Sequence, residues 1–226
     1  MAATPSAKQL TLLKSAVFVL ALLPFARMVW LTLAGQLVEP LEFITHGTGD
    51  WTLYFLCITL AVTPLRRLAR ANWLLKLRRM LGLFAFFYAG LHFMTFLWFD
   101  HFFDLAAVWK DVMKRPFITV GFAGFVLLLP LAATSTNAMV RRLGGKRWQA
   151  LHRLIYLIAP LGILHFWWMK AAKNNLGQPL LFGGIVALLL GARLFWRLAG
   201  ARPGAATGAT RPATAPDRLR SQRQEH

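Results

Sequence analysis

Cysteine and acidic side chains are scarce in this sequence, and the two shortages exclude several classes of protein. Cys57 is the only cysteine among 226 residues, so the chain forms no intrachain disulfide and carries no cysteine-rich metal motif. Aspartate and glutamate together number 8, and none is expected well inside a predicted helix. This argues against a carboxylate-based proton relay or ion site. The sequence also lacks a P-loop and the glycine fingerprint of a dinucleotide-binding fold, so no hydrolytic or nucleotide-dependent chemistry is indicated.

Long apolar runs occupy most of the chain instead. Hydrophobic residues make up 57% of the sequence and the mean hydropathy is +0.51, well above the values of soluble domains. Most runs approach the roughly 20 residues that a helix needs to cross the hydrocarbon core, and the second needs part of 41–50 as well. They lack strand-like alternation, so they predict an all-α integral membrane protein with a bundle of six transmembrane helices. The runs are Ser15–Leu33, Trp51–Leu65, Met80–Phe99, Phe117–Thr134, Trp148–Met169 and Leu180–Trp196.

The first run could instead be a cleavable signal peptide, because Lys8 and Lys14 precede it. Arg27 and Trp30 interrupt its far half, however, and no clear small-residue cleavage site follows. We therefore interpret this run as a helix that the mature protein retains.

Positive charge alternates between the predicted loops. The net charge is +18, and acidic residues fall mainly in the first and third loops. By the positive-inside rule, both termini are cytoplasmic and the odd-numbered loops lie outside. The charge thus reflects membrane topology and does not indicate binding to nucleic acid. The basic residues cluster in the second and fourth loops and the C-terminal segment: Arg66, Arg67, Arg70, Lys76, Arg78, Arg79, Arg141, Arg142, Lys146, Arg147, Arg197, Arg202, Arg211, Arg218, Arg220 and Arg223.

The sequence divides into two parts of different composition. Residues 1–200 form the predicted six-helix domain, which is the part expected to bind a cofactor. Residues 201–226 are rich in Arg, Pro and Ala and almost free of large apolar side chains, which predicts a disordered cytoplasmic tail. Within the first part, Phe102–Met113 has an apolar stripe broken by charges and is expected to lie flat on the outer membrane surface.

Three histidines, His92, His152 and His165, lie inside or at the edge of apolar runs. An ionisable side chain there indicates a functional site, and imidazole is a common axial ligand of haem iron. At about 1.5 Å per residue from Arg79 and Arg147, His92 and His165 both reach the outer half of the bilayer. They form the natural pair across one haem. His152 lies near the cytoplasmic face, where no other histidine matches its depth, and would serve a second site.

The alternative to ligation is that these histidines only hydrogen-bond between helices. Two small residues favour ligation by His92 and His165. Ala89 precedes His92 by about one turn, and Gly162 does the same for His165, which leaves room for a flat macrocycle beside each ring.

Other polar residues have simpler interpretations. His152 could contact a haem propionate or a lipid headgroup instead of iron. Arg27 could pair with a propionate or a quinone, or could only extend its charge to the membrane interface. His46 and His101 lie in outer loops and His226 ends the tail, so solvated side chains are expected for all three.

Several short motifs occur in the order and spacing of a known family. They are Thr63-Pro64-Leu65-Arg66-Arg67, Arg78-Arg79-Met80-Leu81-Gly82-Leu83, Tyr88-Ala89-Gly90-Leu91-His92-Phe93, Lys114-Arg115-Pro116-Phe117-Ile118-Thr119-Val120-Gly121, Ala133-Thr134-Ser135, Arg142-Leu143-Gly144 and Trp148-Gln149-Ala150-Leu151-His152-Arg153-Leu154-Ile155-Tyr156. Together they resemble the MsrQ (YedZ) family of the ferric-reductase-like transmembrane superfamily, whose members are haem-binding membrane subunits of the bacterial periplasmic protein-methionine-sulfoxide reductase system. The resemblance extends from about Leu12 to Arg197.

The resemblance implies a multi-pass protein of the bacterial inner membrane that transfers electrons and has no complete catalytic site of its own. Its electrons would come from the quinol pool or from a cytoplasmic flavin reductase. They would pass to MsrP, a periplasmic molybdopterin enzyme that reduces methionine sulfoxide in oxidised proteins. The family's haem histidines map onto His92, His152 and His165, which implies one haem b, or two if His152 binds a second. FMN is a further cofactor that the resemblance implies, with no residues assigned to it.

Two other functions stay open. One is a cytochrome b or metal-reductase-like subunit that serves another acceptor, although the sequence shows no fused flavin and nicotinamide domain. The other is a cofactor-free transporter or assembly factor in which the histidines serve only as polar contacts between helices.

Overall fold

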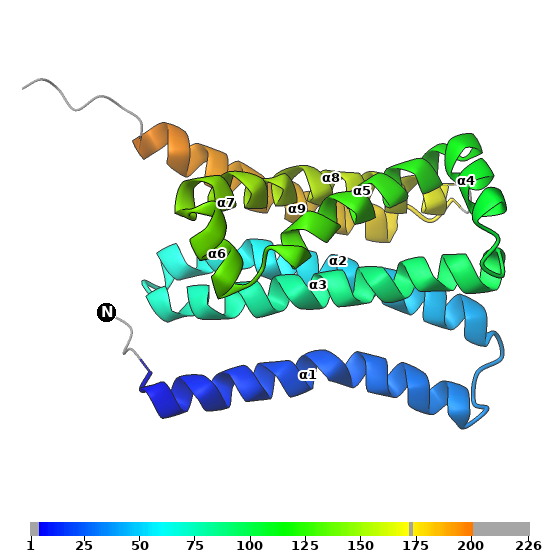
Figure 1. The fold of residues 1–226 in the computed structure, drawn as a ribbon, viewed down its shortest axis with the longest axis horizontal. Coiled ribbons are helices and arrows are strands. Elements are labelled where there is room, and N and C mark those ends of the chain that lie inside the picture. The colour runs from blue at the N-terminus through cyan, green and yellow to red at the C-terminus, as the bar shows by residue number, and fades with distance from the viewer. Residues whose placement is uncertain (1–4, 172–173, 201–226) are drawn as a thin grey trace, which may run out of the picture.

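The computed structural model describes residues 5–171 and 174–200, and within them the chain forms helices and turns without a β-strand (Figure 1). This confirms the all-helical prediction. The segment 201–226, predicted as a disordered tail, lies outside the described residues. The six long helices are α1 (Ala7–Leu33), α2 (Pro40–Leu68), α3 (Leu75–Thr95), α5 (Pro116–Ala133), α8 (Ile155–Ala171) and α9 (Gly177–Gly200).

Shorter helical elements join or extend the long ones. A 3-10 turn, η1 (Asn72–Leu74), leads into α3, and a widened π-helical turn, η2 (Phe96–Asp100), continues it. The helix α4 (Leu105–Lys114) follows, and α6 (Asn137–Leu143) and α7 (Gly145–Leu151) connect α5 to α8. Between α7 and α8 lies a second 3-10 turn, η3 (His152–Leu154), so the predicted fifth run is a segmented helix.

Within the part of the chain that the structure describes, five helical stretches are long and apolar enough to cross a membrane. They are Ala7–Leu33, Asn72–Asp100, Pro116–Ala133, Gly145–Ala171 and Gly177–Ala199. These stretches agree with five of the six predicted runs.

The remaining predicted span is the second along the chain. It corresponds to α2, which is the most polar of the long helices. With 29 residues it is long enough to cross a membrane, and it begins at Pro40, so it includes 41–50 as predicted. Polar residues in its first half and Arg66 and Arg67 in its last turn lower its hydropathy. Asp50 is half-buried within this helix. The expectation that no acidic residue lies well inside a helix is therefore wrong at this position.

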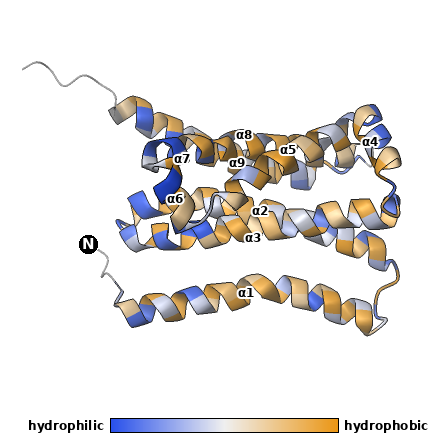
Figure 2. Ribbon diagram, in the orientation of Figure 1, coloured by the Kyte–Doolittle hydropathy of each residue, from blue (hydrophilic) through white to orange (hydrophobic). Residues whose placement is uncertain are grey.

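The two ends of the bundle differ in charge. The start of α1, the end of α9, and the short helices α6 and α7 all lie at one end, whereas α4 lies at the other (Figure 1). Hydrophobic residues cover the middle of the bundle, and hydrophilic residues concentrate on α6, on the start of α7 and near the ends of the long helices (Figure 2). The end with α6 and α7 carries the basic clusters of the second and fourth loops, as their sequence positions require. We call it the basic end.

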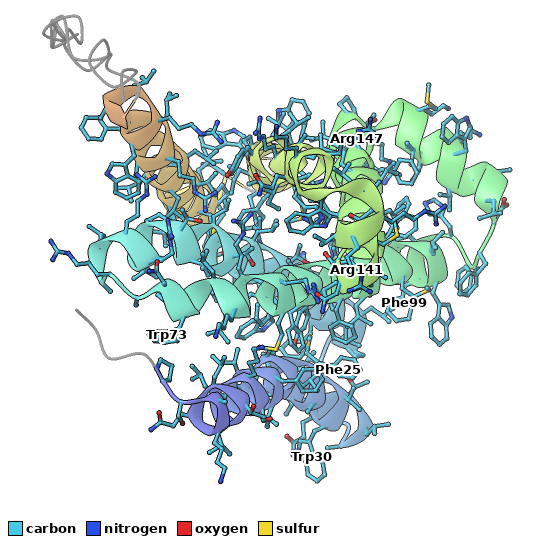
Figure 3. The ribbon with its side chains drawn as sticks, turned by 60° about the vertical axis from the view of Figure 1, so that its left-hand side comes forward. Phe25, Trp30, Trp73, Phe99, Arg141 and Arg147 are labelled. Carbon is cyan, nitrogen blue, oxygen red and sulfur yellow. The ribbon has the colours of Figure 1, made fainter. Side chains whose placement is uncertain are left out.

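A buried tyrosine connects α1 to the rest of the bundle. Pro24 lacks an N–H and interrupts the hydrogen bonds of α1. The hydroxyl of Tyr88, a fully buried residue of α3, is inserted at this point. It donates to the carbonyl oxygen of Ala21 at 2.7 Å and accepts from the N–H of Phe25 at 3.2 Å. The side chain of Phe25 points from α1 toward α2 and α3, whereas Trp30 points away from them (Figure 3).

The amphipathic segment predicted at Phe102–Met113 forms α4, which packs on α5 at the end opposite the basic end. Asp104 caps this helix, because its carboxylate accepts from the N–H groups of Ala106 and Ala107 at 2.9 and 3.1 Å. Its apolar face is only partly covered: Val112 is buried, whereas Trp109 is 59% exposed. The helix is confirmed, and its placement on the membrane surface stays a prediction.

Candidate functional site

The imidazole rings of His92 and His165 lie side by side inside the bundle. His92 comes from α3 and His165 from α8, and their ring centres lie 6.1 Å apart with the ring planes at 72°. Both side chains are half-buried and line one cavity of about 290 Å³, which we call the histidine cavity. The similar depth of the two residues along their helices predicts that they lie close together, and in the structure they do.

Each ring is held through the same nitrogen. Nδ1 of His92 lies 3.0 Å from the carbonyl oxygen of Thr45 on α2, and Nδ1 of His165 lies 2.7 Å from the carbonyl oxygen of Phe117 on α5. A carbonyl only accepts, so each Nδ1 carries the proton and donates. In the neutral rings this leaves the lone pair on Nε2, the tautomer that suits a metal ligand whose orientation is fixed by a backbone carbonyl.

A glycine follows each of these carbonyls by four residues, one helical turn later. A Cβ added at Gly49 would lie 3.3 Å from Cε1 of His92. A Cβ added at Gly121 would lie 2.7 Å from Nδ1 of His165. Only a residue without a side chain therefore allows His165 to approach α5 so closely, and Gly49 gives His92 similar room on α2.

Small and aromatic side chains form the remaining walls of the histidine cavity. Ala89 and Gly162, which were predicted to leave room for a cofactor beside the histidines, both line this cavity. The aromatic wall includes Phe93, whose ring stacks on that of Phe125 with centroids 4.6 Å apart. The walls are thus largely apolar, as a site for a large hydrophobic cofactor requires.

The polar groups of the histidine cavity include two cations. They are Arg115, at the start of α5, and Lys170, near the end of α8. Arg115 is 3.5 Å from Asp111, and its side chain remains 58% exposed. Asp50 of α2 also lines the cavity. These groups lie toward the end of the bundle that carries α4, where anionic substituents of a cofactor would meet positive charge.

The paired histidines fit a haem better than a bare metal ion. Among the described residues, no group of three or more His, Cys, Asp or Glu side chains is placed to hold a metal. A bare transition metal needs about four ligands, whereas haem iron takes four nitrogens from its macrocycle and needs the protein only at its axial positions. With a nitrogen–metal bond of about 2 Å and a ring centre about 1 Å behind each nitrogen, two axial imidazoles have centres about 6 Å apart. The observed 6.1 Å matches this spacing.

His152 lies in a different place. It starts the 3-10 turn η3 and lines a second cavity, of about 270 Å³, near the basic end. Its Nε2 is 3.0 Å from the hydroxyl oxygen of Thr134. The indole of Trp148 stacks on its ring with centroids 3.9 Å apart and donates from Nε1 to the carbonyl oxygen of Thr134 at 2.9 Å. No second histidine is among the lining residues that the structure describes.

The structure corrects two expectations about solvated histidines. His46 belongs to α2 and not to a loop, lines the histidine cavity, and lies 3.5 Å from Glu42. The side chain of His101 is only 10% exposed, lies 3.3 Å from Asp111, and packs edge-on against Phe96. Both differ from expectation because α2 and the turn before α4 fold back onto the bundle. His226 lies outside the described residues.

Arg27 is not among the lining residues of either cavity; its guanidinium lies 5.8 Å from the ring centre of Phe43. Gly49, Arg115 and Lys170 line the histidine cavity but were not predicted to do so. Arg115 and Gly121 do occur in one of the motifs that carry the family resemblance. That motif was the only sign in the sequence that this part of the cavity wall is functional. Gly49 and Lys170 had no comparable signal.

Comparison with known proteins identifies the family of the chain. Residues 47–163 match the family described as the ferric reductase like transmembrane component, and this range contains His92 and His152. The "Protein-methionine-sulfoxide reductase heme-binding subunit MsrQ" of Herminiimonas arsenicoxydans is 70% identical over 193 residues, which cover 85% of this chain and 88% of that protein.

Proteins with the same name in other bacteria are also similar. That of Ralstonia nicotianae is 56% identical over 206 residues, covering 91% of this chain and 95% of the relative. That of Azospira oryzae is 48% identical over 197 residues, covering 86% and 83%. No solved structure shows significant similarity to the chain.

Proposed function

The chain belongs to the MsrQ family of ferric reductase like transmembrane proteins, and from this we propose that it is a membrane b-type cytochrome. Its electrons come from the quinol pool or from a cytoplasmic flavin reductase. They pass to a periplasmic molybdopterin methionine sulfoxide reductase, MsrP, which repairs oxidised periplasmic proteins. The relatives' name, which states haem binding within a methionine sulfoxide reductase system, supports this proposal.

His92 and His165 are the proposed axial ligands of one haem b. The observation that carries this assignment is the 6.1 Å spacing of two rings whose Nδ1 atoms are both bonded to backbone carbonyls. The haem supplies one-electron chemistry when bound. Arg115 and Lys170 are placed to meet its propionates. With both axial positions taken by imidazole, oxygen binding is disfavoured, which suits an electron relay.

The proposed topology places both termini in the cytoplasm and six helices across the bacterial inner membrane. The six are the five apolar stretches and α2. The concentration of Lys and Arg at the basic end supports it. The histidine cavity then lies nearer the periplasm, where MsrP would dock on the connection that contains α4 and on the α8–α9 connection. Residues 1–200 form the membrane domain in this proposal.

His152 and FMN complete the proposal for cofactors. His152 borders a cavity of its own near the basic end, and we propose no iron ligation for it because its Nε2 lies 3.0 Å from the hydroxyl oxygen of Thr134 and Trp148 stacks on its ring. FMN enters as a proposed second cofactor through the family resemblance, with no residues assigned to it.

The test is the reduced-minus-oxidised visible spectrum of detergent-purified protein, with haem quantified per chain. We expect a low-spin b-type spectrum and one haem per chain. His92→Ala and His165→Ala should each lose most of the haem. His46→Ala and His101→Ala are matched controls, since His46 lines the same cavity and His101 lies at the same end of the bundle, and both should keep it.

Equal haem content in all four variants would overturn the ligand assignment. A featureless spectrum after expression with adequate haem supply would remove the electron-transfer function and favour a transporter or an assembly factor. A normal spectrum without electron transfer to purified MsrP would instead support a cytochrome that serves another acceptor.

A further inference from the structure

One carboxylate oxygen lies between a histidine and an arginine at the end of the bundle that carries α4. Oδ2 of Asp111 is 3.3 Å from Nε2 of His101 and 3.5 Å from a terminal guanidinium nitrogen of Arg115. His101 follows the π-helical turn η2, Asp111 belongs to α4, and Arg115 joins α4 to α5. Of these three residues, Arg115 is the one that lines the histidine cavity. Asp111 is therefore placed to control a cation at the edge of that cavity.

Arg115 occupies a position where a helix favours an anion. It is the N-cap residue of α5, and Pro116 follows it as the first residue of that helix. The unpaired N–H groups give the N-terminus of a helix a partial positive charge, so a cation is disfavoured there. The carboxylate of Asp111, one helical turn earlier in the chain, offsets this charge. Local helix stability therefore does not explain an arginine at this corner, whereas a role toward the histidine cavity does.

The backbone of Arg115 is fixed at the corner between α4 and α5. Its N–H donates to the carbonyl oxygen of Asp111 at 2.9 Å. The hydroxyl of Thr119 in α5 donates to the carbonyl oxygen of Val112 in α4, which closes the corner. The side chain of Arg115 is less constrained, because 58% of it is exposed. Its ion pair with Asp111 is what limits the directions that the guanidinium takes.

His101 holds the carboxylate of Asp111 from the other side. The side chain of His101 is almost completely buried and packs edge-on against Phe96, with ring centroids 4.7 Å apart. Phe96 is itself a wall residue of the histidine cavity. Nε2 of His101 has no hydrogen-bond partner, so its contact with Asp111 restricts the carboxylate by packing. The carboxylate is thus confined between a buried ring and the guanidinium that it pairs with.

The turn that brings His101 to Asp111 is strained. Phe102 and Phe103 have φ angles of 47° and 65°, in the left-handed region that side chains disfavour. Such strain persists only where the surrounding structure requires it, and it is concentrated at functional sites. Here the strained turn folds α4 back onto α5 and so places Asp111 beside the corner (Figure 1).

We propose that Asp111 is a positioning residue that holds the guanidinium of Arg115 toward the histidine cavity and thereby raises the midpoint potential of the haem. A cation beside the cavity favours the reduced state, because it attracts the added negative charge. His101 supports this role by restricting the carboxylate of Asp111. This role rests on the proposed function, since it needs a haem in the histidine cavity.

The experiment is a double-mutant cycle measured by redox titration of the haem spectrum in purified protein. The cycle compares Arg115→Gln, Asp111→Asn and the variant that carries both substitutions. Lys114→Gln is the matched control for Arg115, since it removes a neighbouring exposed cation that does not line the cavity. Asp104→Asn is the matched control for Asp111, because it removes a carboxylate from the start of the same helix and asparagine caps a helix equally well.

Arg115→Gln should lower the midpoint potential at unchanged haem content, whereas Lys114→Gln should leave the potential near the wild-type value. In the Asp111→Asn background, Arg115→Gln should produce at most about half of that shift, because the guanidinium is no longer held toward the cavity. In the Asp104→Asn background it should produce the full shift. An Asp111 that acted only through its own charge, or only in folding, would leave the effect of Arg115→Gln unchanged.

Equal shifts from Arg115→Gln in the wild-type and Asp111→Asn backgrounds would overturn the positioning role. Equal potentials in Arg115→Gln and Lys114→Gln would also overturn it, and this comparison decides even if Asp111→Asn loses its haem. A wild-type protein without haem would overturn the proposed function and this role together. Haem at the expected ratio with additive shifts would overturn the positioning role alone.

Discussion

The imidazole of His165 lies directly against the backbone of Gly121. A Cβ at position 121 would come within 2.7 Å of Nδ1 and 2.9 Å of Cε1. The same Nδ1 is 2.7 Å from the carbonyl oxygen of Phe117, one helical turn earlier. A side chain at the later position would stand beside that carbonyl, so the glycine is what allows the imidazole to reach it. Thr45 and Gly49 repeat this arrangement for His92, with a looser contact.

We expect Gly121→Ala to lower the haem content of the purified protein by roughly tenfold or more, as loss of a partner that orients a metal ligand does. The added methyl group would force the ring of His165 off the carbonyl and out of line with His92. Haem per chain, measured from the reduced spectrum, checks this. Gly49→Ala should have a smaller effect, because its Cβ would be 3.3 Å from the nearest ring atom.

Gly90→Ala is the matched control for the glycine substitutions. Gly90 lies on α3 near His92, and a Cβ there would have no neighbour within 4 Å. Alanine also favours a helix over glycine by about 1 kcal/mol, so folding itself should not suffer. Similar haem contents in Gly90→Ala and Gly121→Ala would show that the close contact does not position His165.

The meeting of His92 and His165 could be predicted from the sequence, because it depends on two quantities that the sequence carries. The rise per residue of a helix is constant, and the clusters around Arg79 and Arg147 fix where two helices enter the membrane. Equal depth then follows by counting. The same count separates His152 from both, and the structure places it in another cavity.

Other features of the site depend on how helices turn and pack, which the sequence alone does not fix. Gly49 and Gly121 matter only because α2 and α5 face the two histidines. The sequence predicts that the second helix includes part of 41–50, but it does not show that Asp50 lines the histidine cavity. Arg193 occurs in an apolar run, and its hydrogen bonds to Tyr156 and Leu60 follow only from the packing of α9 on α8 and α2.

Tyr88→Phe should destabilise the protein by about 1–2 kcal/mol, because it leaves the N–H of Phe25 and the carbonyl of Ala21 without their partner beside Pro24. For a chain of this size the midpoint of thermal unfolding should fall by about 2–8 °C, measured in detergent. Tyr54→Phe is the control, since Tyr54 is 41% exposed. Equal midpoints for the two variants would show that the inserted hydroxyl contributes nothing to stability.

The substitution His152→Ala should leave the haem content and the spectrum of the purified protein unchanged. The reason is that His152 lines the second cavity, near the basic end and apart from His92 and His165, and its Nε2 is 3.0 Å from the hydroxyl oxygen of Thr134. Quantifying haem per chain in the variant and the wild type checks this. A wild-type ratio of two that falls to one in the variant would establish a second haem on His152.

The proposed orientation in the membrane predicts which short helix faces which side. Ala106 of α4 and Ala150 of α7 are both exposed alanines, and their helices lie at opposite ends of the bundle. In a background in which Cys57, half-buried in α2, is replaced by alanine, each can become the single cysteine of the chain. A membrane-impermeant maleimide applied to spheroplasts should label Ala106→Cys directly and Ala150→Cys only after permeabilisation. This expectation follows from the retention of Lys and Arg on the cytoplasmic side. The opposite labelling pattern would mean that the basic end faces the periplasm. The histidine cavity would then open toward the cytoplasm, which is incompatible with delivery of electrons to a periplasmic reductase.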